Sequence, residues 1–188
     1  MSVLPILAFG DPILKAKAKA IEKDYPGLDV LISSMWETMY KANGVGLAAP
    51  QIGKSIRLFL IDASPYGDEE AELADFKKVF INAEVIESSG KEYLFNEGCL
   101  SFPDLREDIR RPPQIRIRYQ DEQFNEHEET FSGLKARIIQ HEYDHIDGIL
   151  MVDRISPLKK TLLKRKLHNI SKGNVSVDYP MRFPLRKR

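Results

Sequence analysis

The feature that most constrains this chain is a pair of histidines four residues apart, His141 and His145, with Glu142 directly after the first of them. Residues four apart on an α-helix point in similar directions and lie about 6 Å apart along the axis, so two such imidazoles can converge on one cation. A carboxylate beside the first histidine can accept a proton from water bound to that cation. The segment therefore predicts a helix that carries a metal site and a general base.

The residues around the two histidines follow the period of an amphipathic helix. Apolar residues fall on one face from Gly133 onward, and Gly148 stands where such a helix should end. The members of this face are Leu134, Ile138, Ile139, Ile146 and Ile149.

Two helical histidines leave a cation short of ligands. In one class of zinc peptidases a third histidine follows at a fixed spacing, but Met151 stands at that position here. In another class a later glutamate serves, and no glutamate follows Glu142. Asp147 and Asp153 remain downstream, although Asp147 would point to another side of the helix. Upstream, Cys99 is a further candidate, because a thiolate binds Zn or Fe(II) well.

Short β-rich segments bounded by Gly, Pro, Asn or Asp predict strands over 56–61, 79–86, 93–95, 115–119 and 128–131. Helices are expected over 27–43, which Asn43-Gly44 ends, and over 156–170, with Ser156 as N-cap and Pro157 in the first turn. The acidic segment 64–75 predicts a solvated loop. Because helices and strands segregate, we expect an α+β fold with antiparallel β-sheets around the central histidine helix, and one catalytic domain over residues 1–188.

The cysteine count and the distribution of apolar residues limit the cellular compartment in which this chain is expected. Cys99 is the single cysteine, so no intrachain disulfide can form and nothing indicates an oxidising environment. Residues 1–9 are apolar, but they are short, contain Pro5 and lack a basic region, so they do not predict a signal peptide. No run approaches the roughly 18 apolar residues of a membrane span. We expect a cytoplasmic monomer that does not engage a membrane.

Charge is unevenly distributed, although the formal net charge is zero. Residues 1–153 hold 17 basic and 27 acidic side chains, whereas residues 154–188 hold 11 basic and one acidic. The last predicted helix has an apolar stripe that can dock on the body and leave its cations outward. The stripe comprises Leu158, Leu162, Leu163, Leu167 and Ile170, and the cations are Lys159, Lys160, Lys164, Arg165 and Lys166. This segment indicates a polyanionic neighbour or, alternatively, a solvated helix face.

Three segments, in this order, resemble the signature motifs of the peptide deformylase family. They are 44–51 (Gly-Val-Gly-Leu-Ala-Ala-Pro-Gln), 97–101 (Glu-Gly-Cys-Leu-Ser) and 140–145 (Gln-His-Glu-Tyr-Asp-His). The opening Gly10-Asp11-Pro12 is similar too, so the resemblance covers about residues 3–155. The family removes the formyl group from the N-terminal formyl-methionine of new bacterial polypeptides and releases formate.

The resemblance implies a role for each matched residue. Cys99, His141 and His145 would bind one divalent ion, commonly Fe(II), although Zn, Ni and Co also suit these ligands. Glu142 would be the general acid and base. Gln51, through its side-chain amide, and Leu100, through its backbone N–H, would donate to the oxyanion. The implied substrate pocket consists of Gly44, Val45, Gly46, Glu97, Leu134 and Ile138.

Two other interpretations use the same residues. One is a zinc endopeptidase with an aspartate ligand, and the other is a non-catalytic domain in which the ion only holds the fold. The implied substrate, a formyl-methionyl nascent peptide, emerges from a ribosome. The basic segment 156–188 is therefore expected to give weak attachment to ribosomal RNA.

Overall fold

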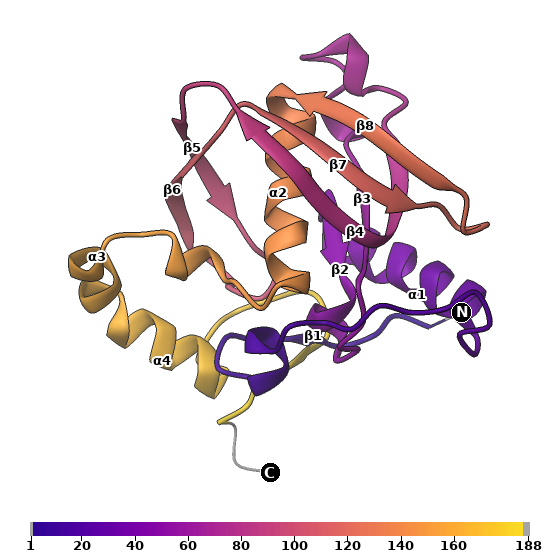
Figure 1. The fold of residues 1–188 in the computed structure, drawn as a ribbon. Helices are drawn as coiled ribbons and strands as arrows, with labels where there is room; N and C mark the ends of the chain where they lie inside the picture. Colours follow the sequence, from indigo (N-terminus) through magenta and orange to yellow (C-terminus); the bar gives the residue numbers. More distant parts are fainter. Residues whose placement is uncertain (1, 186–188) are drawn as a thin grey trace.

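The computed structural model describes residues 2–185 and consists of antiparallel sheets arranged around one helix (Figure 1). The main sheet has five antiparallel strands in the order β2-β3-β4-β7-β8. These strands are β2 (Gly46–Ala48), β3 (Leu58–Asp62), β4 (Lys77–Ser89), β7 (Gln114–Gln120) and β8 (Glu126–Ser132). A separate antiparallel pair joins β5 (Tyr93–Gly98) to β6 (Arg106–Arg111). The predicted α+β class with antiparallel sheets is confirmed.

Helices cover both faces of the main sheet. Side chains on β3 alternate between two cores: Leu58 and Leu60 pack with α1 (Leu28–Lys41), whereas Phe59 and Ile61 pack with α2 (Gly133–Ile146). This explains why β3 is apolar at consecutive positions, because a strand buried on both faces has no polar side. Figure 1 shows α2, which carries the two histidines, running between the main sheet and the β5–β6 pair.

The helix ends occur close to the predicted signals. At the end of α1, Asn43 has a φ of 53°, and the Gly44 N–H donates to the Met39 carbonyl at 2.9 Å. Asn43 rather than Gly44 therefore adopts the left-handed conformation that terminates the helix. Beyond α2, Gly148 has a φ of 72°, and a Cβ there would lie 2.6 Å from the Lys15 carbonyl oxygen, so this position requires glycine.

One prediction was wrong in part, and one strand was missed. The segment 64–75 is not wholly a solvated loop, because it forms 3₁₀ turns at Ser64–Tyr66 and Ala71–Leu73, and Leu73 is fully buried. Strand β6 was not predicted, because Ile109 is its single strongly apolar residue and its charged neighbours hide the alternation.

The helix predicted over 156–170 is two helices, α3 (Pro157–Leu162) and α4 (Lys164–Lys172), which meet at Leu163. Ser156 caps α3, as predicted, by accepting from the Lys159 N–H at 3.2 Å. The break changes the direction of the apolar stripe. Leu167 and Ile170 are buried, whereas Leu158 and Leu162 are 72% and 74% exposed, so the front half of the predicted stripe does not dock on the body.

The chain returns from α4 towards its beginning. Strand β9 (Met181–Arg182) pairs in parallel with β1 (Ile6–Leu7), a contact that joins the two ends of the described chain. Within residues 2–185, every helix falls short of the length and apolar character that crossing a membrane requires.

Candidate metal centre and active-site pocket

Three side chains with metal-binding atoms meet beside α2. His141 and His145 lie one turn apart on this helix, and their ring centroids are 5.3 Å apart. The chain leaving β5 brings Cys99 to them, so that its Sγ lies 3.3 Å from Nε2 of His145. One ligand atom of each of the three residues lies within 4.8 Å of the other two. A thiolate and two imidazoles at this spacing can share one cation.

The polar atoms around this cluster fit a cation. His141 Nδ1 is 2.9 Å from a carboxylate oxygen of Glu97, which leaves Nε2 as the free ring nitrogen. Such a carboxylate behind a ligating imidazole is the usual support for a metal-bound histidine. Burial lowers the pKa of His145, with further lowering from His141 and Arg111, so its imidazole is neutral and able to act as a ligand.

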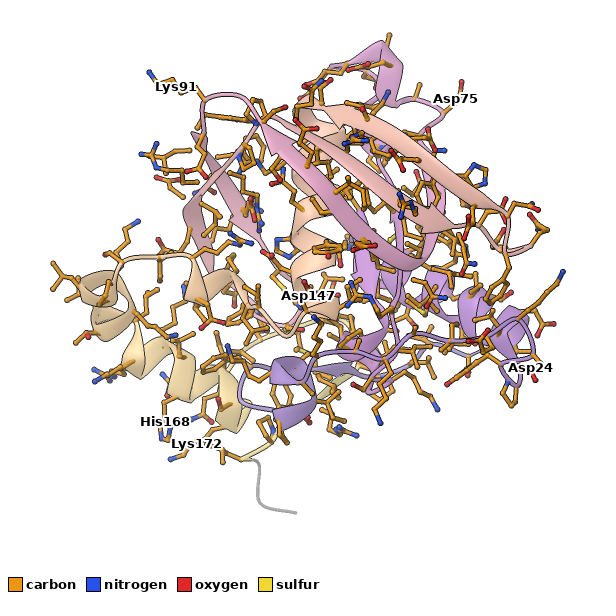
Figure 2. The ribbon with its side chains drawn as sticks, in the orientation of Figure 1. Asp24, Asp75, Lys91, Asp147, His168 and Lys172 are labelled. Atoms are coloured by element: carbon orange, nitrogen blue, oxygen red, sulfur yellow. The ribbon has the colours of Figure 1, made fainter. Side chains whose placement is uncertain are left out.

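The alternative aspartate ligands lie elsewhere. Asp147 follows the end of α2 (Figure 2) and accepts from Arg57 Nη1 at 2.7 Å. The Asp153 carboxylate pairs with Lys15 at 2.5 Å and with Lys160 at 2.8 Å. Both carboxylates are therefore committed to cations of the protein, and Cys99 is the candidate third ligand that the fold brings to the histidines.

Glu142 lies next to the cluster and is buried. The residue is 4% exposed, and among residues 2–185 its Oε2 has no hydrogen-bond partner. Burial raises the pKa of this carboxyl to about 7, against the opposing charges of His141 and Arg111. Gly46 on β2 makes room for it, because a Cβ at this position would lie 2.8 Å from Glu142 Cδ. The glycine thus accommodates the candidate general base, a role that the sequence did not indicate.

Replacing Gly46 with alanine is therefore expected to reduce catalysis more than stability. The added methyl group would displace the Glu142 carboxylate, and a shift of about 1 Å in a catalytic group can cost about 100-fold in rate. Steady-state kinetics on the purified variant would measure this loss. Gly27→Ala is the control for stability loss alone: a Cβ there meets nothing within 4 Å, but its φ of 68° makes alanine strained, so this variant should lose stability and keep its kcat. Equal activity in Gly46→Ala and wild type would show that this contact does not position Glu142.

A buried ion network holds the side of α2 that carries the candidate metal ligands. Arg111, which is 1% exposed, donates to Glu97 at 2.8 and 3.0 Å and to Asp144 at 2.7 Å. Although burial alone would raise the pKa of Glu97, hydrogen bonds from His141 and Arg111 hold it well below the usual range. The Glu97 carboxylate is therefore ionised and oriented towards His141, whereas the sequence suggested only a pocket residue.

The two expected oxyanion donors lie near Cys99. The Gln51 side-chain oxygen accepts from the Ala48 N–H at 2.8 Å, and this contact turns its Nε2 towards Cys99 Sγ, 3.7 Å away, and Ser101 Oγ, 3.4 Å away. Leu100 directly follows the cysteine. Within residues 2–185 its backbone N–H has no protein acceptor and remains available to a ligand.

One open pocket of about 380 Å³ is bordered by Gln51, Cys99, Leu100, His141 and Glu142, whereas His145 does not line it. The residues expected to bind substrate all contribute to its lining: Gly44, Val45, Gly46, Glu97, Leu134 and Ile138. Further lining residues were not anticipated from the sequence, and three of them come from separate parts of the chain. Tyr66 comes from the acidic segment, Arg137 from α2 and Tyr179 from the C-terminal return. Arg137 lies three residues after Leu134, a helical spacing that could have indicated it, whereas Tyr66 and Tyr179 carry no local signal.

A Cys/His/His cluster beside a buried carboxylate, at the base of a pocket open to ligands, defines a metal-dependent hydrolase. Comparison with known proteins narrows this class. The family model described as polypeptide deformylase matches residues 3–161. The chain belongs to the polypeptide deformylase family.

Named relatives agree with this assignment along nearly the whole chain. Peptide deformylase of Christiangramia forsetii is 58% identical over 99% of this chain and 98% of its own length. That of Flavobacterium psychrophilum is 51% identical over 99% of this chain and 100% of its own length. Among solved structures, peptide deformylase from Legionella pneumophila has a TM-score of 0.79 at 38% identity, covering 92% of this chain and 98% of its own. That from Thermotoga maritima has a TM-score of 0.75 at 39% identity, covering 84% and 100%.

Proposed function

We propose that this chain hydrolyses the N-terminal formyl amide of formyl-methionyl polypeptides, and that the residues around Cys99 carry out the reaction. The observation that carries this proposal is the meeting of Cys99, His141 and His145 beside the buried Glu142, whose Oε2 has no hydrogen-bond partner within residues 2–185. Cys99, His141 and His145 would hold the divalent ion. When bound, this ion would polarise the formyl oxygen and make water a stronger nucleophile at neutral pH.

Groups of this chain move the proton and stabilise the negative charge that develops on the formyl oxygen. Glu142 accepts a proton from the attacking water as its oxygen bonds to the formyl carbon. Gln51 Nε2 and the Leu100 N–H donate to the oxygen that becomes negatively charged. The C–N bond then breaks, and Glu142 passes its proton to the departing amine nitrogen. The products are formate and a peptide with a free N-terminus.

The pocket supports a methionine side chain beside the reacting group. Leu134 and Ile138 lie on the face of α2 that also presents His141, and Val45 belongs to the loop before β2. These apolar side chains would contact the methionine, while the glycines at 44 and 46 admit a peptide backbone. Glu97 contributes to the pocket indirectly, because its carboxylate orients His141.

Two peptides distinguish this function from that of an endopeptidase. A formyl-methionyl tripeptide should release one formate per molecule, whereas a peptide with an acetylated N-terminus and several internal bonds should remain intact. Rapid internal cleavage without formate release would reject the proposal. Omitting the formyl group from the first peptide provides the blank for the formate assay.

For the bound ion we propose Fe(II), because one cysteine sulfur and two imidazole nitrogens suit it, although Zn, Ni and Co suit the same ligands. We also propose that residues 1–188 act as a single catalytic domain and a cytoplasmic monomer. Anaerobic purification followed by metal analysis and light scattering tests the ion and the oligomeric state together. About one iron per chain at the monomer mass is the expected result.

We further propose that the basic C-terminal segment attaches the enzyme weakly to ribosomal RNA. Figure 2 shows His168 and Lys172 on the side of α4 that faces away from the sheets. Lys164 and Arg165 on the same helix are also exposed. A cluster of exposed cations on one helix can bind a phosphate backbone, with an affinity that falls as salt is raised.

Reversing three of these charges, with Lys164→Glu, Arg165→Glu and Lys172→Glu together, is expected to weaken ribosome cosedimentation about tenfold at low salt. The same change at Lys23, Lys41 and Lys54, which are exposed outside this segment, is the matched control. Binding that is indifferent to salt, or weakened equally by both triple variants, would contradict the proposed attachment. Deformylation of a free tripeptide should be unchanged in both.

A further inference from the structure

The chain beyond α4 runs back to the catalytic pocket. The Ile6 N–H donates to the Pro180 carbonyl at 2.9 Å, and the Ala8 N–H donates to the Arg182 carbonyl at 2.9 Å. The Arg182 side chain pairs with Asp11 at 2.9 Å. These contacts fix the return segment, residues 174–185, against the N-terminal strand. Immediately before this pairing, Tyr179 reaches the lining of the pocket.

The return segment contacts the turn that carries the third metal ligand. Three successive carbonyls of this turn are held by different parts of the chain. The Cys99 carbonyl accepts from the Phe102 N–H at 2.8 Å, within the turn itself. The Leu100 carbonyl accepts from the Tyr179 hydroxyl at 2.9 Å, and the Ser101 carbonyl accepts from the Phe9 N–H at 2.9 Å. Tyr179 therefore supplies the only side-chain contact among these three.

The Leu100 carbonyl belongs to the residue whose N–H is the candidate oxyanion donor. The Leu100 N–H shares a peptide plane with the Cys99 carbonyl, which accepts from Phe102, whereas the Leu100 carbonyl belongs to the next peptide plane. The two planes meet at the Leu100 Cα, so holding the second plane as well limits the backbone rotation that would turn the N–H away from the pocket. The structure assigns Tyr179 as a positioning residue that orients the Leu100 N–H towards the developing oxyanion. This inference rests on the proposed deformylase function.

The surroundings of Tyr179 suit a fixed donor. Burial raises the pKa of its hydroxyl, with a further contribution from the nearby Cys99, so the group stays protonated and donates. Tyr179 also lies beyond residues 3–161, the part matched by the family model. The positioning contact is therefore contributed by a segment outside the motifs that define the family.

Tyr179→Phe tests this role in the full-length, metal-loaded protein. The substitution removes one hydroxyl and keeps the ring, so the return segment retains its packing. Removing an oxyanion donor outright lowers kcat by about 100- to 1,000-fold, so loosening one should lower it by about 5- to 20-fold. Because the Leu100 N–H acts mainly on the transition state, KM for a formyl-methionyl tripeptide should stay within about twofold.

Tyr119→Phe is the control, since Tyr119 also has hydroxyl partners, Lys78 and Glu129, but it lies on β7 outside the pocket. Tyr119 is buried whereas Tyr179 is half-buried, so Tyr119→Phe should lower the thermal midpoint at least as much as Tyr179→Phe does, and leave kcat unchanged. A kcat within twofold of wild type in Tyr179→Phe would overturn the inference, as would an equal loss in Tyr119→Phe or a loss explained by lower metal content. Absence of formate release from wild type would instead reject the proposed function.

Discussion

Glu142→Gln is expected to lower kcat for formate release by about 100- to 10,000-fold while the metal content stays at its wild-type value. The glutamine has nearly the same shape, so it should occupy the space that Gly46 leaves open, but it cannot accept a proton from water. Metal should be retained because the candidate ligands are Cys99, His141 and His145. Steady-state kinetics and metal analysis on the same preparation measure both quantities.

Glu126→Gln on the exposed edge of β8 provides the control for this substitution. It removes an equivalent charge far from the pocket and should leave both kcat and metal content unchanged. If Glu142→Gln kept both wild-type activity and its metal, Glu142 would not be the general base, and another group would have to accept the proton from water. The combination of retained metal and lost turnover is therefore the signature of a catalytic carboxylate.

Cys99→Ala should bind the ion about 100-fold more weakly or worse, because it removes one of three protein ligands. Formate release should fall with the metal content. The ligands that remain, His141 and His145, come from a single helix, and the aspartates nearby are already paired with Arg57, Lys15 and Lys160. Within residues 2–185, neither Asp147 nor Asp153 is therefore free to replace the thiolate.

Metal ligation by Cys99 can also be measured through the reactivity of its thiol, since Cys99 is the single cysteine in the chain. A thiol reagent should leave the metal-loaded wild-type protein unmodified and should react with one equivalent after the metal has been chelated. Full metal occupancy in Cys99→Ala, or equal labelling with and without metal, would contradict ligation by this residue. Either result would mean that a group other than Cys99 is the third ligand.

The parts of the site that could be predicted are those encoded locally. The spacing of His141 and His145 in an amphipathic helix predicted their shared direction, and α2 has the expected start and end. Helix α1 and strands β3, β4 and β7 could also be predicted, because their apolar residues follow the pattern that burial imposes. In each case a short run of residues contained the determining information.

The parts that could not be predicted depend on contacts between distant segments. Arg111 is hidden in a charged strand, and only the fold brings it between Glu97 and Asp144. The break at Leu163 separates α3 from α4 although the apolar period continues through it, so propensity and periodicity do not reveal it. Tyr179 reaches Leu100 across 79 positions of sequence, and no local pattern encodes that contact.

Formate release from a formyl-methionyl tripeptide, measured before metal removal, after it and after adding Fe(II) back under anaerobic conditions, tests the central claim most directly. The account predicts one formate per peptide, loss of the activity on chelation and its recovery with Fe(II). Formate release that survives complete metal removal, or cleavage of peptide bonds with no formate produced, would contradict it.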